Sequence, residues 1–584
     1  MSMLNTSPEI VQEIVDEKAL PVDNLAQKPA LFGNTAPGAI GLMAATLALA
    51  ACGGGGVEVA SPSPIASNPP TPPPPTAAMV RPTAKQASRF LQLGTMGATQ
   101  SEITALQTTT PAAWLDEQVA IPRSTSHWQW LIDNNYGTEA DKNNRAAFDY
   151  TIWRKLISSP DALRQRMTFA LSQILVVGLD GLNNSYSVFS LANYVDILER
   201  NAFGNFRTLL EEASLSPAMG IYLSHRGNKK ADAAGRLPDE NYAREIMQLF
   251  TIGLYELNND GTQKILANQP IETYDQADVS NLARVFTGWD FARITGVPTE
   301  INDRDRQALP MVLNAANHSP EAKSFLSANI GANVSGTDSL KIALDTLFNH
   351  PNVGPFIGKQ LIQRLVTSNP SGTYVNRVAN AFNNTGGVRG DLKATLKAVL
   401  LDDEALNPPA GNSGKLMEPV LRFTQWARAF GLTSSTNFWA GNTSDPATRL
   451  GQSPFRSTSV FNFFRPGYVP PSTTFAARGW VVPELQIIHE TSVAGYVNYM
   501  QTVVSGGNTN MTPNYDSWLT KVDSIDTLLA DLNLVLAANR LGSATLDTIR
   551  SAALSIPTTS DAGKKNRLYT AILLMLASPE FIST

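Results

Sequence analysis

Polar side chains that could do chemistry recur at helical spacing between residues 237 and 253. In a helix that begins near Asn241, the residues Asn241, Glu245 and Gln248 lie at i, i+4 and i+7, and therefore on one face. A carboxylate on such a face, partly removed from water, can transfer protons, bind a metal or pair with a cation. Glu245 is therefore the first candidate for a functional residue.

A second polar face follows shortly after the first. Asp278, Asn281 and Arg284 lie at i, i+3 and i+6 of the next expected helix. If a hairpin joins the two helices, Glu245 can pair with Arg284 or with Arg244 and lie near Asp278. Two interpretations stay open here. One is a structural ion-pair network that fixes helix register, and the other is a pocket in which Glu245 is an acid, a base or a metal ligand.

Other motifs that often carry chemistry are incomplete. The segment Gly354–Gln360 has three residues between its glycines and lacks the Ser or Thr of a P-loop. No two of the five histidines are locally spaced as metal ligands, and the single Cys excludes a multi-cysteine site. We therefore predict no cofactor and no metal. Among the histidines, His225 is expected in a solvated loop, His350 at a helix end, and His318 as a candidate catalytic partner.

The elements that must position these residues read as helices. In Asp161–Val177, the residues Leu163, Met167 and Leu171 fall on an apolar stripe, and Arg164 falls on the opposite, polar face. Nine further segments show similar periodicity: Tyr186–Asn201, Asn241–Leu254, Asp275–Phe286, Ser339–Asn349, Val353–Val366, Leu392–Leu401, Glu418–Phe430, Leu485–Val503 and Arg567–Ala577.

Strand patterns are scarce in this sequence. The best hairpin candidate is Leu254–Ile265, because Asp260-Gly261 in its middle suits the positive φ angles of a tight turn. The segments 288–317, 433–453 and 506–516 are rich in small polar residues and are expected to be loops. The predicted fold is all-α, with one large helical body over 83–584, minor hairpins and long loops.

Composition narrows the class of protein. Hydrophobic residues make up 43% of the 584, which is enough to build a large core. Lys and Arg number 45 against 50 Asp and Glu, for a net charge of -5, and there is no long basic run. Because binding to phosphate backbones needs a concentrated positive surface, a nucleic-acid partner is not expected.

The N-terminal region predicts where the protein goes. After an acidic stretch, Ala39–Ala51 is an apolar run too short to span a bilayer but typical of a signal peptide. It ends in Leu49-Ala50-Ala51-Cys52, which resembles the bacterial lipobox, in which the cysteine is lipidated. A Gly, Pro and Ser-rich stretch follows that cannot pack a core. We therefore divide the chain into a leader (1–52), a disordered tether (53–82) and the helical body (83–584), and expect export and a membrane anchor at Cys52.

Several motifs in fixed order resemble one bacterial family. They are N-Y-A-R-E-I-M-Q-L-F-T-I-G-L, D-V-S-N-L-A-R-V-F-T-G-W, H-P-N-V-G-P-F-I-G-K-Q-L-I-Q-R-L-V-T-S-N-P-S, S-P-F-R-S-T-S-V-F-N-F-F-R-P-G-Y-V-P-P, V-P-E-L-Q-I and L-A-S-P-E-F. Together they resemble the domain-of-unknown-function 1800 family over about residues 83–584. The resemblance implies a large, mostly helical, exported protein that often occurs alongside sulfatase-like partners. It implies no established reaction.

The sequence departs from that family at two positions. Many members carry His where Phe250 stands, and Asp where Ser319 follows His318, with a lysine further on that matches Lys323. A metal site built from the family's His and Asp would therefore lack two ligands here.

Three hypotheses for the function remain. The first, which we favour, is a lipid-anchored scaffold or interaction protein of the cell envelope. The second is a hydrolase-type enzyme that uses Glu245, Asp278 and His318. The third is a glycan-binding protein that uses the aromatic residues of 461–484. Binding residues of the polar region would be Asn241, Arg244, Arg284 and Lys323.

Overall fold

Helices build most of the described chain, as the sequence predicts. The computed structural model describes residues 76–384, 387–409, 411, 414–507 and 510–584. Cys52, the apolar run before it and the predicted tether up to residue 75 lie outside the described residues. Within them the strands form three sheets of two short antiparallel strands each, so the all-α prediction is confirmed.

The elements of the first half run in this order: η1 (Thr76–Met79), α1 (Ala84–Gly94), α2 (Gln100–Leu106), α3 (Pro111–Ala120), α4 (His127–Asp133), α5 (Ala146–Ser158), α6 (Ala162–Ser172), η2 (Leu179–Gly181), α7 (Ser187–Asn201), α8 (Phe206–Ser214), α9 (Pro217–Tyr222), α10 (Asn241–Gln248), β1 (Ile265–Leu266), β2 (Gln269–Pro270), α11 (Gln276–Val285) and β3 (Trp289–Asp290).

The second half continues with α12 (Thr299–Asp305), η3 (Arg306–Ala308), β4 (Val312–Leu313), η4 (Ala315–Asn317), β5 (Lys323–Phe325), β6 (Ala328–Ile330), α13 (Gly336–Asn349), α14 (Val353–Leu365), α15 (Gly372–Asn384), α16 (Leu392–Leu400), α17 (Asp403–Leu406), α18 (Pro419–Ala429), α19 (Thr474–Ala477), η5 (Pro483–Ile487), α20 (Glu490–Val504), α21 (Asp516–Leu519), α22 (Ile525–Ala537), α23 (Ser543–Leu554), α24 (Asp561–Leu576) and α25 (Pro579–Ile582).

Local sequence explains where many of these helices begin. The side chains of Thr83, Thr99 and Asp275 each accept a hydrogen bond from the backbone N–H of the third helical residue. The side chain of that third residue accepts a hydrogen bond from the backbone N–H of the capping residue. This reciprocal arrangement satisfies two backbone donors that the helix itself leaves unpaired. The capping residues just before α1, α2 and α11 therefore determine where these helices begin.

Helix α6 is buried on every side, which corrects one prediction. Met167 and Leu171 lie in the core as expected. Arg164, predicted on a polar outer face, is also buried: its Nη1 donates to the Glu199 carbonyl over 3.0 Å, and its guanidinium lies 4.5 Å from the centre of the Phe203 ring. Periodicity predicts the position of the helix, but its polar residues are covered by other helices rather than by water: Arg164 by α7, and Arg166 by α1 and α14.

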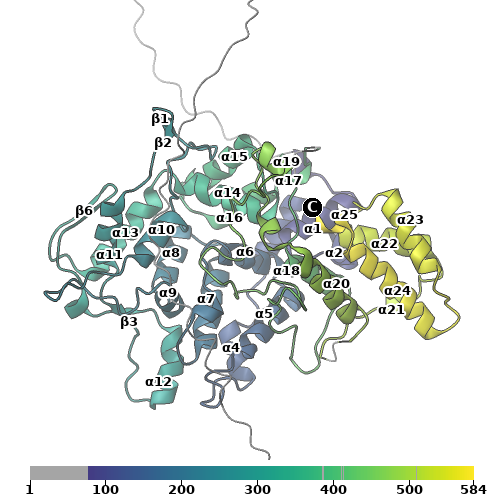
Figure 1. The fold of residues 1–584 in the computed structure, drawn as a ribbon, viewed down its shortest axis with the longest axis horizontal. Coiled ribbons are helices and arrows are strands. Elements are labelled where there is room, and N and C mark those ends of the chain that lie inside the picture. The colour runs from purple at the N-terminus through teal and green to yellow at the C-terminus, as the bar shows by residue number, and fades with distance from the viewer. Residues whose placement is uncertain (1–75, 385–386, 410, 412–413, 508–509) are drawn as a thin grey trace, which may run out of the picture. The chain divides into compact units, whose positions relative to one another are not determined.

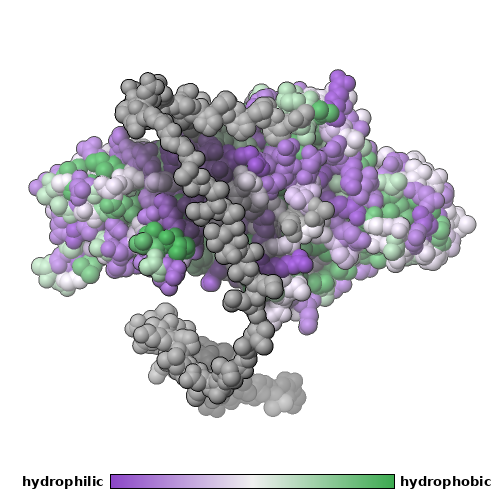
Figure 2. All heavy atoms as spheres, turned by 90° about the horizontal axis from the view of Figure 1, so that it is seen from above, coloured by the Kyte–Doolittle hydropathy of each residue, from purple (hydrophilic) through white to green (hydrophobic). Residues whose placement is uncertain are grey.

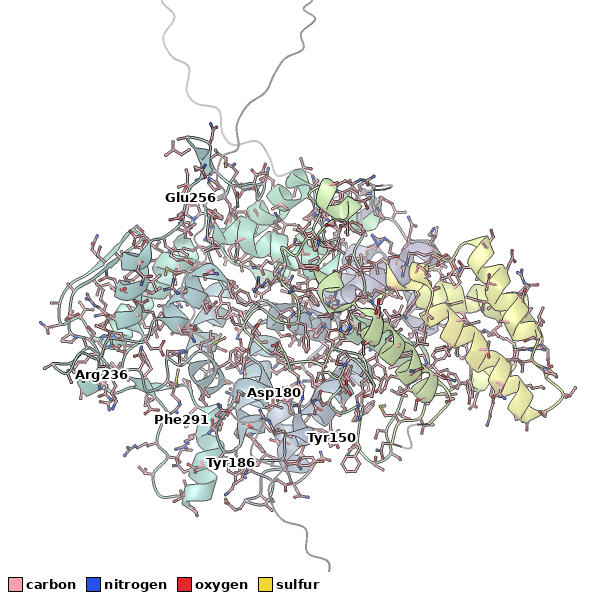
Figure 3. All side chains as sticks on the ribbon, viewed as in Figure 1. Tyr150, Asp180, Tyr186, Arg236, Glu256 and Phe291 are labelled. Atoms are coloured by element: carbon pink, nitrogen blue, oxygen red, sulfur yellow. The ribbon has the colours of Figure 1, made fainter. Side chains whose placement is uncertain are left out.

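The predicted hairpin between α10 and α11 is present and longer than expected. Gly261 has a φ of +77°, and Leu257 pairs with Gln263 across the Asp260-Gly261 turn. Strands β1 and β2 then pair around a second turn beyond Ile265. In Figure 1 this second tip projects from the body beside α14 and α15, and Glu256 near its base is labelled in Figure 3.

One continuous hydrophobic core joins the described helices, from Ala87 in α1 to Phe581 in α25. These residues belong to a single compact unit, Pro72–Thr584. Helix α1 packs on α22, so the start of the body contacts its C-terminal helices, and α10 packs on α11, which contacts β5. None of the described helices has the length and apolar character needed to cross a membrane.

Candidate functional site

Glu245 projects from α10 as a half-buried carboxylate without a partner. Its Oε2 is buried, and the described residues offer it no hydrogen bond and no ion pair. Burial raises the pKa of Glu245, and the positive charge of Arg244 counteracts this only in part. A carboxyl group in this condition holds its proton to higher pH than an ordinary glutamate.

The predicted ion pairs of Glu245 are not formed. The Nε of Arg284 lies 3.1 Å from Oε2 of Glu321, and the Nη2 of Arg244 lies 3.3 Å from Oε2 of Glu240. Both arginines therefore pair with other carboxylates, and the predicted ion pair of Glu245 with Arg284 or Arg244 is wrong. The reason is local: Glu240 lies one helical turn before Arg244, and the chain after α11 brings Glu321 to Arg284.

Asp278 is occupied as a helix cap. Its Oδ2 accepts the backbone N–H of Asp275 over 2.9 Å, while its Oδ1 accepts the N–H of Leu326 over 2.6 Å. It thus ties the start of α11 to the turn between β5 and β6. Asn241, the first residue of α10, is exposed, and its amide donates to the Ser224 hydroxyl over 3.4 Å. Both residues have structural contacts that explain their presence.

His318 and Lys323 form a second polar group, which follows α11 in the chain. The His318 Nδ1 donates to the Thr287 carbonyl over 2.8 Å, and its buried Nε2 has no partner among the described residues. The Lys323 ammonium donates to the carbonyls of Ser319 and Glu321 over 3.0 and 3.1 Å. Burial lowers the pKa of both His318 and Lys323. The group is buried, and its contacts are chiefly to the backbone.

The two departures from the family also have clear structural roles. Phe250 is fully buried against Tyr242, with ring centres 6.5 Å apart. The backbone N–H of Ser319 donates to the hydroxyl of Thr287 over 2.9 Å. Neither position offers a metal ligand, because a phenyl ring has no donor atom and the Ser319 hydroxyl lacks the charge of a carboxylate.

A buried ionic network that the sequence did not reveal lies between α4, α5 and α7. His127 Nε2 lies 3.2 Å from Oε1 of Glu199, and the Lys155 ammonium lies 2.5 Å from Oε2 of the same carboxylate. Asp196 accepts the backbone N–H groups of His127 and Trp128 over 2.8 and 3.0 Å, and so caps α4. All of these side chains are buried.

The charges in this network explain its titration. Burial alone would raise the pKa of Glu199, but hydrogen bonds and charges from His127 and Lys155 outweigh it and lower that pKa to about 2. Burial lowers the pKa of His127, and the positive charge of Lys155 lowers it further. Glu199 is therefore an anion at neutral pH that is held by a buried ammonium.

The network has the donor types of a metal site but does not fit one well. Among the described residues, His127, Asp196 and Glu199 are the group whose ligand atoms could converge on one ion. However, Lys155 already neutralises Glu199, and the helix start of α4 already uses both oxygens of Asp196. A metal ion would have to displace an ammonium and uncap a helix. The arrangement is that of a structural ion-pair network.

A second buried network holds a motif of the sequence in place. Arg456 binds Asp149 through two parallel bonds, Nε to Oδ1 over 2.8 Å and Nη2 to Oδ2 over 2.7 Å. Its Nη1 also lies 3.3 Å from Oδ1 of Asp180, which is labelled in Figure 3. This bidentate geometry anchors the S-P-F-R segment to α5.

The aromatic segment proposed for glycan binding is half-exposed. The guanidinium of Arg465 lies 4.8 Å from the centre of the Phe461 ring, and that of Arg478 lies 4.9 Å from the Trp480 ring. Each cation covers one face of its ring, so a sugar would have to stack on the opposite face. These contacts give the segment a packing role of its own.

His225 is buried, not solvated as predicted. Its ring stacks on Tyr242 with centres 3.9 Å apart, and its Nε2 lies 2.8 Å from the Ser214 carbonyl. Burial lowers its pKa to about 4. The prediction came from the charged neighbours Arg226, Lys229 and Lys230. These three residues are exposed or partly exposed, whereas His225 is buried. His350 does end a helix as predicted, as the C-terminal cap of α13.

Comparison with known proteins identifies one family. Its sequence model, described as "Protein of unknown function (DUF1800)", matches residues 89–583, nearly the whole body. No curated protein matches the chain, and no solved structure does.

Proposed function

Because the chain belongs to the DUF1800 family, whose function is unknown, we propose a function from its own residues: a lipid-anchored scaffold of the cell envelope. In this proposal Cys52 carries the lipid, the residues between Cys52 and η1 form the tether, and the helical body contacts a partner. The predicted tether ends earlier than residue 82, because Thr76–Met79 form η1 and Ala78 is buried. The observation that carries the anchor is the sequence Leu49-Ala50-Ala51-Cys52 at the end of an apolar run, with no other cysteine in the chain.

The state of the polar residues supports a scaffold. Asp278 caps a helix, Arg244 and Arg284 pair with nearby carboxylates, and Lys323 donates to backbone carbonyls. These side chains are engaged in holding elements together. Of the three residues considered for a catalytic centre, Asp278 is therefore engaged in a structural contact, whereas Glu245 keeps a buried oxygen without a partner among the described residues.

An exposed apolar hairpin offers a surface for the partner. Side chains near its tip and base, Ile265, Leu266, Leu254 and Tyr255, are 57%, 69%, 47% and 36% exposed. On the face seen in Figure 2, apolar residues of the described chain are otherwise scattered in small groups among hydrophilic ones. Apolar side chains gathered on one projecting element are typical of a protein contact. A sulfatase-like protein is the partner class that we propose.

The anchor is tested by Cys52→Ser in the native host. We expect the parent protein in the membrane fraction and the variant either in the soluble extracytoplasmic fraction or stalled as precursor. A matched control, Ser61→Cys in the Cys52→Ser background, returns a cysteine without the preceding Leu-Ala-Ala and should not restore anchoring. A Cys52→Ser variant that fractionates and migrates like the parent would contradict the proposal.

The scaffold is tested separately, by capture of partners from envelope extracts. The parent and the variant Ile265→Ser/Leu266→Ser are compared, with Leu574→Ser on α24, another partly exposed leucine, as the control. We expect a sulfatase-like protein with the parent and the control, and its loss with the hairpin variant. Equal capture by all three would place the contact elsewhere.

A second candidate, an enzyme centred on Glu245, is favoured by one observation. Glu245 is a half-buried carboxyl group without a partner, and burial raises its pKa. Such a group is suited to donate a proton as a general acid. If Glu245 is a general acid, Glu245→Gln should abolish the activity and leave the stability intact. If Glu245 has no catalytic role, Glu245→Gln should leave any activity unchanged.

A further inference from the structure

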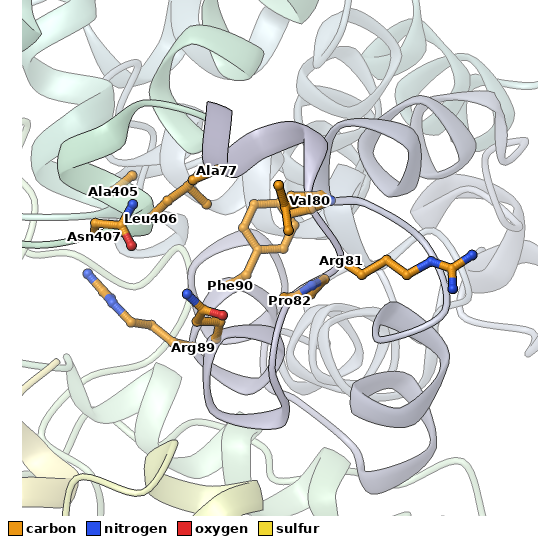
Figure 4. A pocket seen from close by; sticks show the side chains of 11 residues that line it. Ala77, Val80, Arg81, Pro82, Arg89, Phe90, Ala405, Leu406 and Asn407 are labelled. Atoms are coloured by element: carbon orange, nitrogen blue, oxygen red, sulfur yellow. The ribbon is translucent and has the colours of Figure 1, made fainter. Parts of the chain in front are cut away.

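A cavity at the N-terminal edge of the body is lined mostly by apolar side chains. It has a volume of about 320 Å³ and lies between η1, α1, the start of α3 and the end of α17 (Figure 4). Most of its lining is apolar, and includes Ala77, Val80, Phe90, Pro111 and Leu406. An apolar pocket of this size with few polar groups is typical of a small-molecule site.

The polar side chains that line the cavity are either cationic or neutral. They belong to Arg81, Gln86, Arg89 and Asn407, and no acidic residue lines the cavity. Arg89 is half-buried, and it makes no hydrogen bond, ion pair or ring contact with the described residues. In Figure 4 its side chain extends along the cavity toward Asn407, whereas Arg81 points away.

The charge of Arg89 is uncompensated by its surroundings. Burial lowers its pKa, and the neighbouring Arg540 is also affected: burial, and then the charge of Arg89, lower the pKa of Arg540 to about 10. The free energy of a cation in such a place falls when an anion binds beside it. A guanidinium presents a planar pair of N–H donors that fits a carboxylate or another oxyanion.

We propose that this cavity binds a small amphipathic anion, with the Arg89 guanidinium on its charged head and the apolar wall around its tail. The single guanidinium that enters the cavity matches one negative charge, so a monocarboxylate is the expected class. A singly charged oxyanion on an apolar tail can reach the site from two sources, a free carboxylate in solution or the phosphodiester of an anionic lipid in a membrane.

The test uses the full-length chain with Cys52→Ser, so that no acyl chain attached to the protein can fill the cavity. Sodium octanoate and octanol are titrated by calorimetry, because they share a tail and differ in the charge of the head. We expect octanoate to bind saturably, to raise the Tm, and to bind about tenfold or more tightly than octanol, as for a hydrogen bond to a charged group.

Variants of the two arginines distinguish binding in this cavity from non-specific hydrophobic binding. Arg89→Met should reduce the affinity for octanoate about tenfold or more, to that of octanol. Its Tm without ligand should stay the same or rise, because the variant removes a desolvated cation beside Arg540. Arg89→Lys, which keeps the charge but loses the planar fork, should bind with intermediate affinity, and Arg81→Met should bind like the parent.

A second arm distinguishes the sources. Vesicles of phosphatidylglycerol and of phosphatidylcholine are sedimented with the Cys52→Ser chain and with the same chain carrying Arg89→Met, so that no lipid attached to the protein binds the vesicles. Binding to octanoate alone assigns a free carboxylate, and Arg89-dependent binding to phosphatidylglycerol assigns a lipid headgroup. Binding in neither arm, or binding that Arg89→Met leaves unchanged, overturns the proposal.

Discussion

The network between α4, α5 and α7 and the polar face of α10 use the same residue types with opposite outcomes. Glu199 is fully buried and is held by an ammonium at 2.5 Å and an imidazole at 3.2 Å. Glu245 is half-buried and has no partner among the described residues. One carboxylate is a charged part of the core, and the other has a pKa that burial raises.

This difference shows that burial alone does not decide what a carboxylate does. Removing a charge from water is costly, and the cost is offset only where a cation and hydrogen-bond donors are placed around it. Around Glu199 the chain supplies both from α4 and α5, and its pKa falls to about 2. Around Glu245 it supplies the charge of Arg244 without an ion pair among the described residues, and burial raises its pKa. The two sites therefore predict opposite responses to the same substitution.

The largest effect is expected in the buried network. Lys155→Met or Glu199→Gln should each lower the free energy of unfolding by about 3–5 kcal/mol, because either change strands the remaining charge in the core. Urea melts at pH 7 measure the loss. The double variant Lys155→Met/Glu199→Leu should recover a large part of it, since an apolar pair of similar volume strands no charge of its own. Losses below about 1 kcal/mol would mean that water reaches the network.

The acid side of the stability curve sharpens the same contrast. The pKa of Glu199 is about 2 in the folded chain and 4.5 ordinarily, so its stabilisation is complete above pH 4.5 and is lost as the pH falls toward 2. The raised pKa of Glu245 has the reverse sign: its contribution is complete below 4.5 and is lost as the pH rises through the folded value. Melts from pH 2 to 7 of Glu199→Gln should show a flatter acid limb than the parent.

Packing in α6 should have an effect almost as large. Met167→Ala and Leu171→Ala each remove a buried side chain and should cost about 2–5 kcal/mol. Arg164→Ala should cost about 1–3 kcal/mol, because it removes a bond to a buried carbonyl and the cover of the Phe203 ring. Leu574→Ala, at a partly exposed position, is the control and should cost clearly less. Equal and small losses at all four positions would contradict the burial of α6.

At Glu245 a much smaller effect is expected. Glu245→Gln should change the free energy of unfolding at pH 7 by less than about 1 kcal/mol, and we expect a gain, because a neutral amide replaces a half-buried carboxylate without a partner among the described residues. Thermal melts of the parent and the variant at pH 7 and pH 4 measure this. A loss of several kcal/mol would reveal a buried ion pair and would contradict the structure around α10.

The sequence predicts helices better than it predicts pairs of side chains. Apolar periodicity and caps are local, so the helix at 187–201 and the hairpin turn at Gly261 follow from nearby residues. The network of His127 and Glu199 joins residues 72 positions apart, and nothing in local spacing shows that they meet. Polar residues of α6 and His225 were expected in water for the same reason, since the covering element is distant in the chain.

The candidate site shows where that limit matters for function. Helical spacing alone points to Glu245, and it predicts a partner that is either Arg284 on the next helix or Arg244 on the same one. The actual partner of Arg284 is Glu321, from a segment beyond α11 whose position depends on the fold of 288–322. The sequence predicts which residues form the polar faces of the helices. It does not predict their ion-pair partners, because these depend on how distant segments fold against each other.

The smallest expected effect tests that choice of partner directly. Arg284 and Glu321 are both partly exposed, with side chains 34% and 53% accessible, so their pair should contribute less than about 1 kcal/mol and weaken in salt. In a double-variant cycle, Arg284→Ala and Glu321→Ala should show a small coupling, whereas Arg284→Ala and Glu245→Gln should be additive. A coupling of Arg284 to Glu245 that exceeds its coupling to Glu321 would restore the pairing expected from helical spacing. Glu245 would then have a cation, its pKa would not be raised, and its role as a proton donor would lose its physical basis.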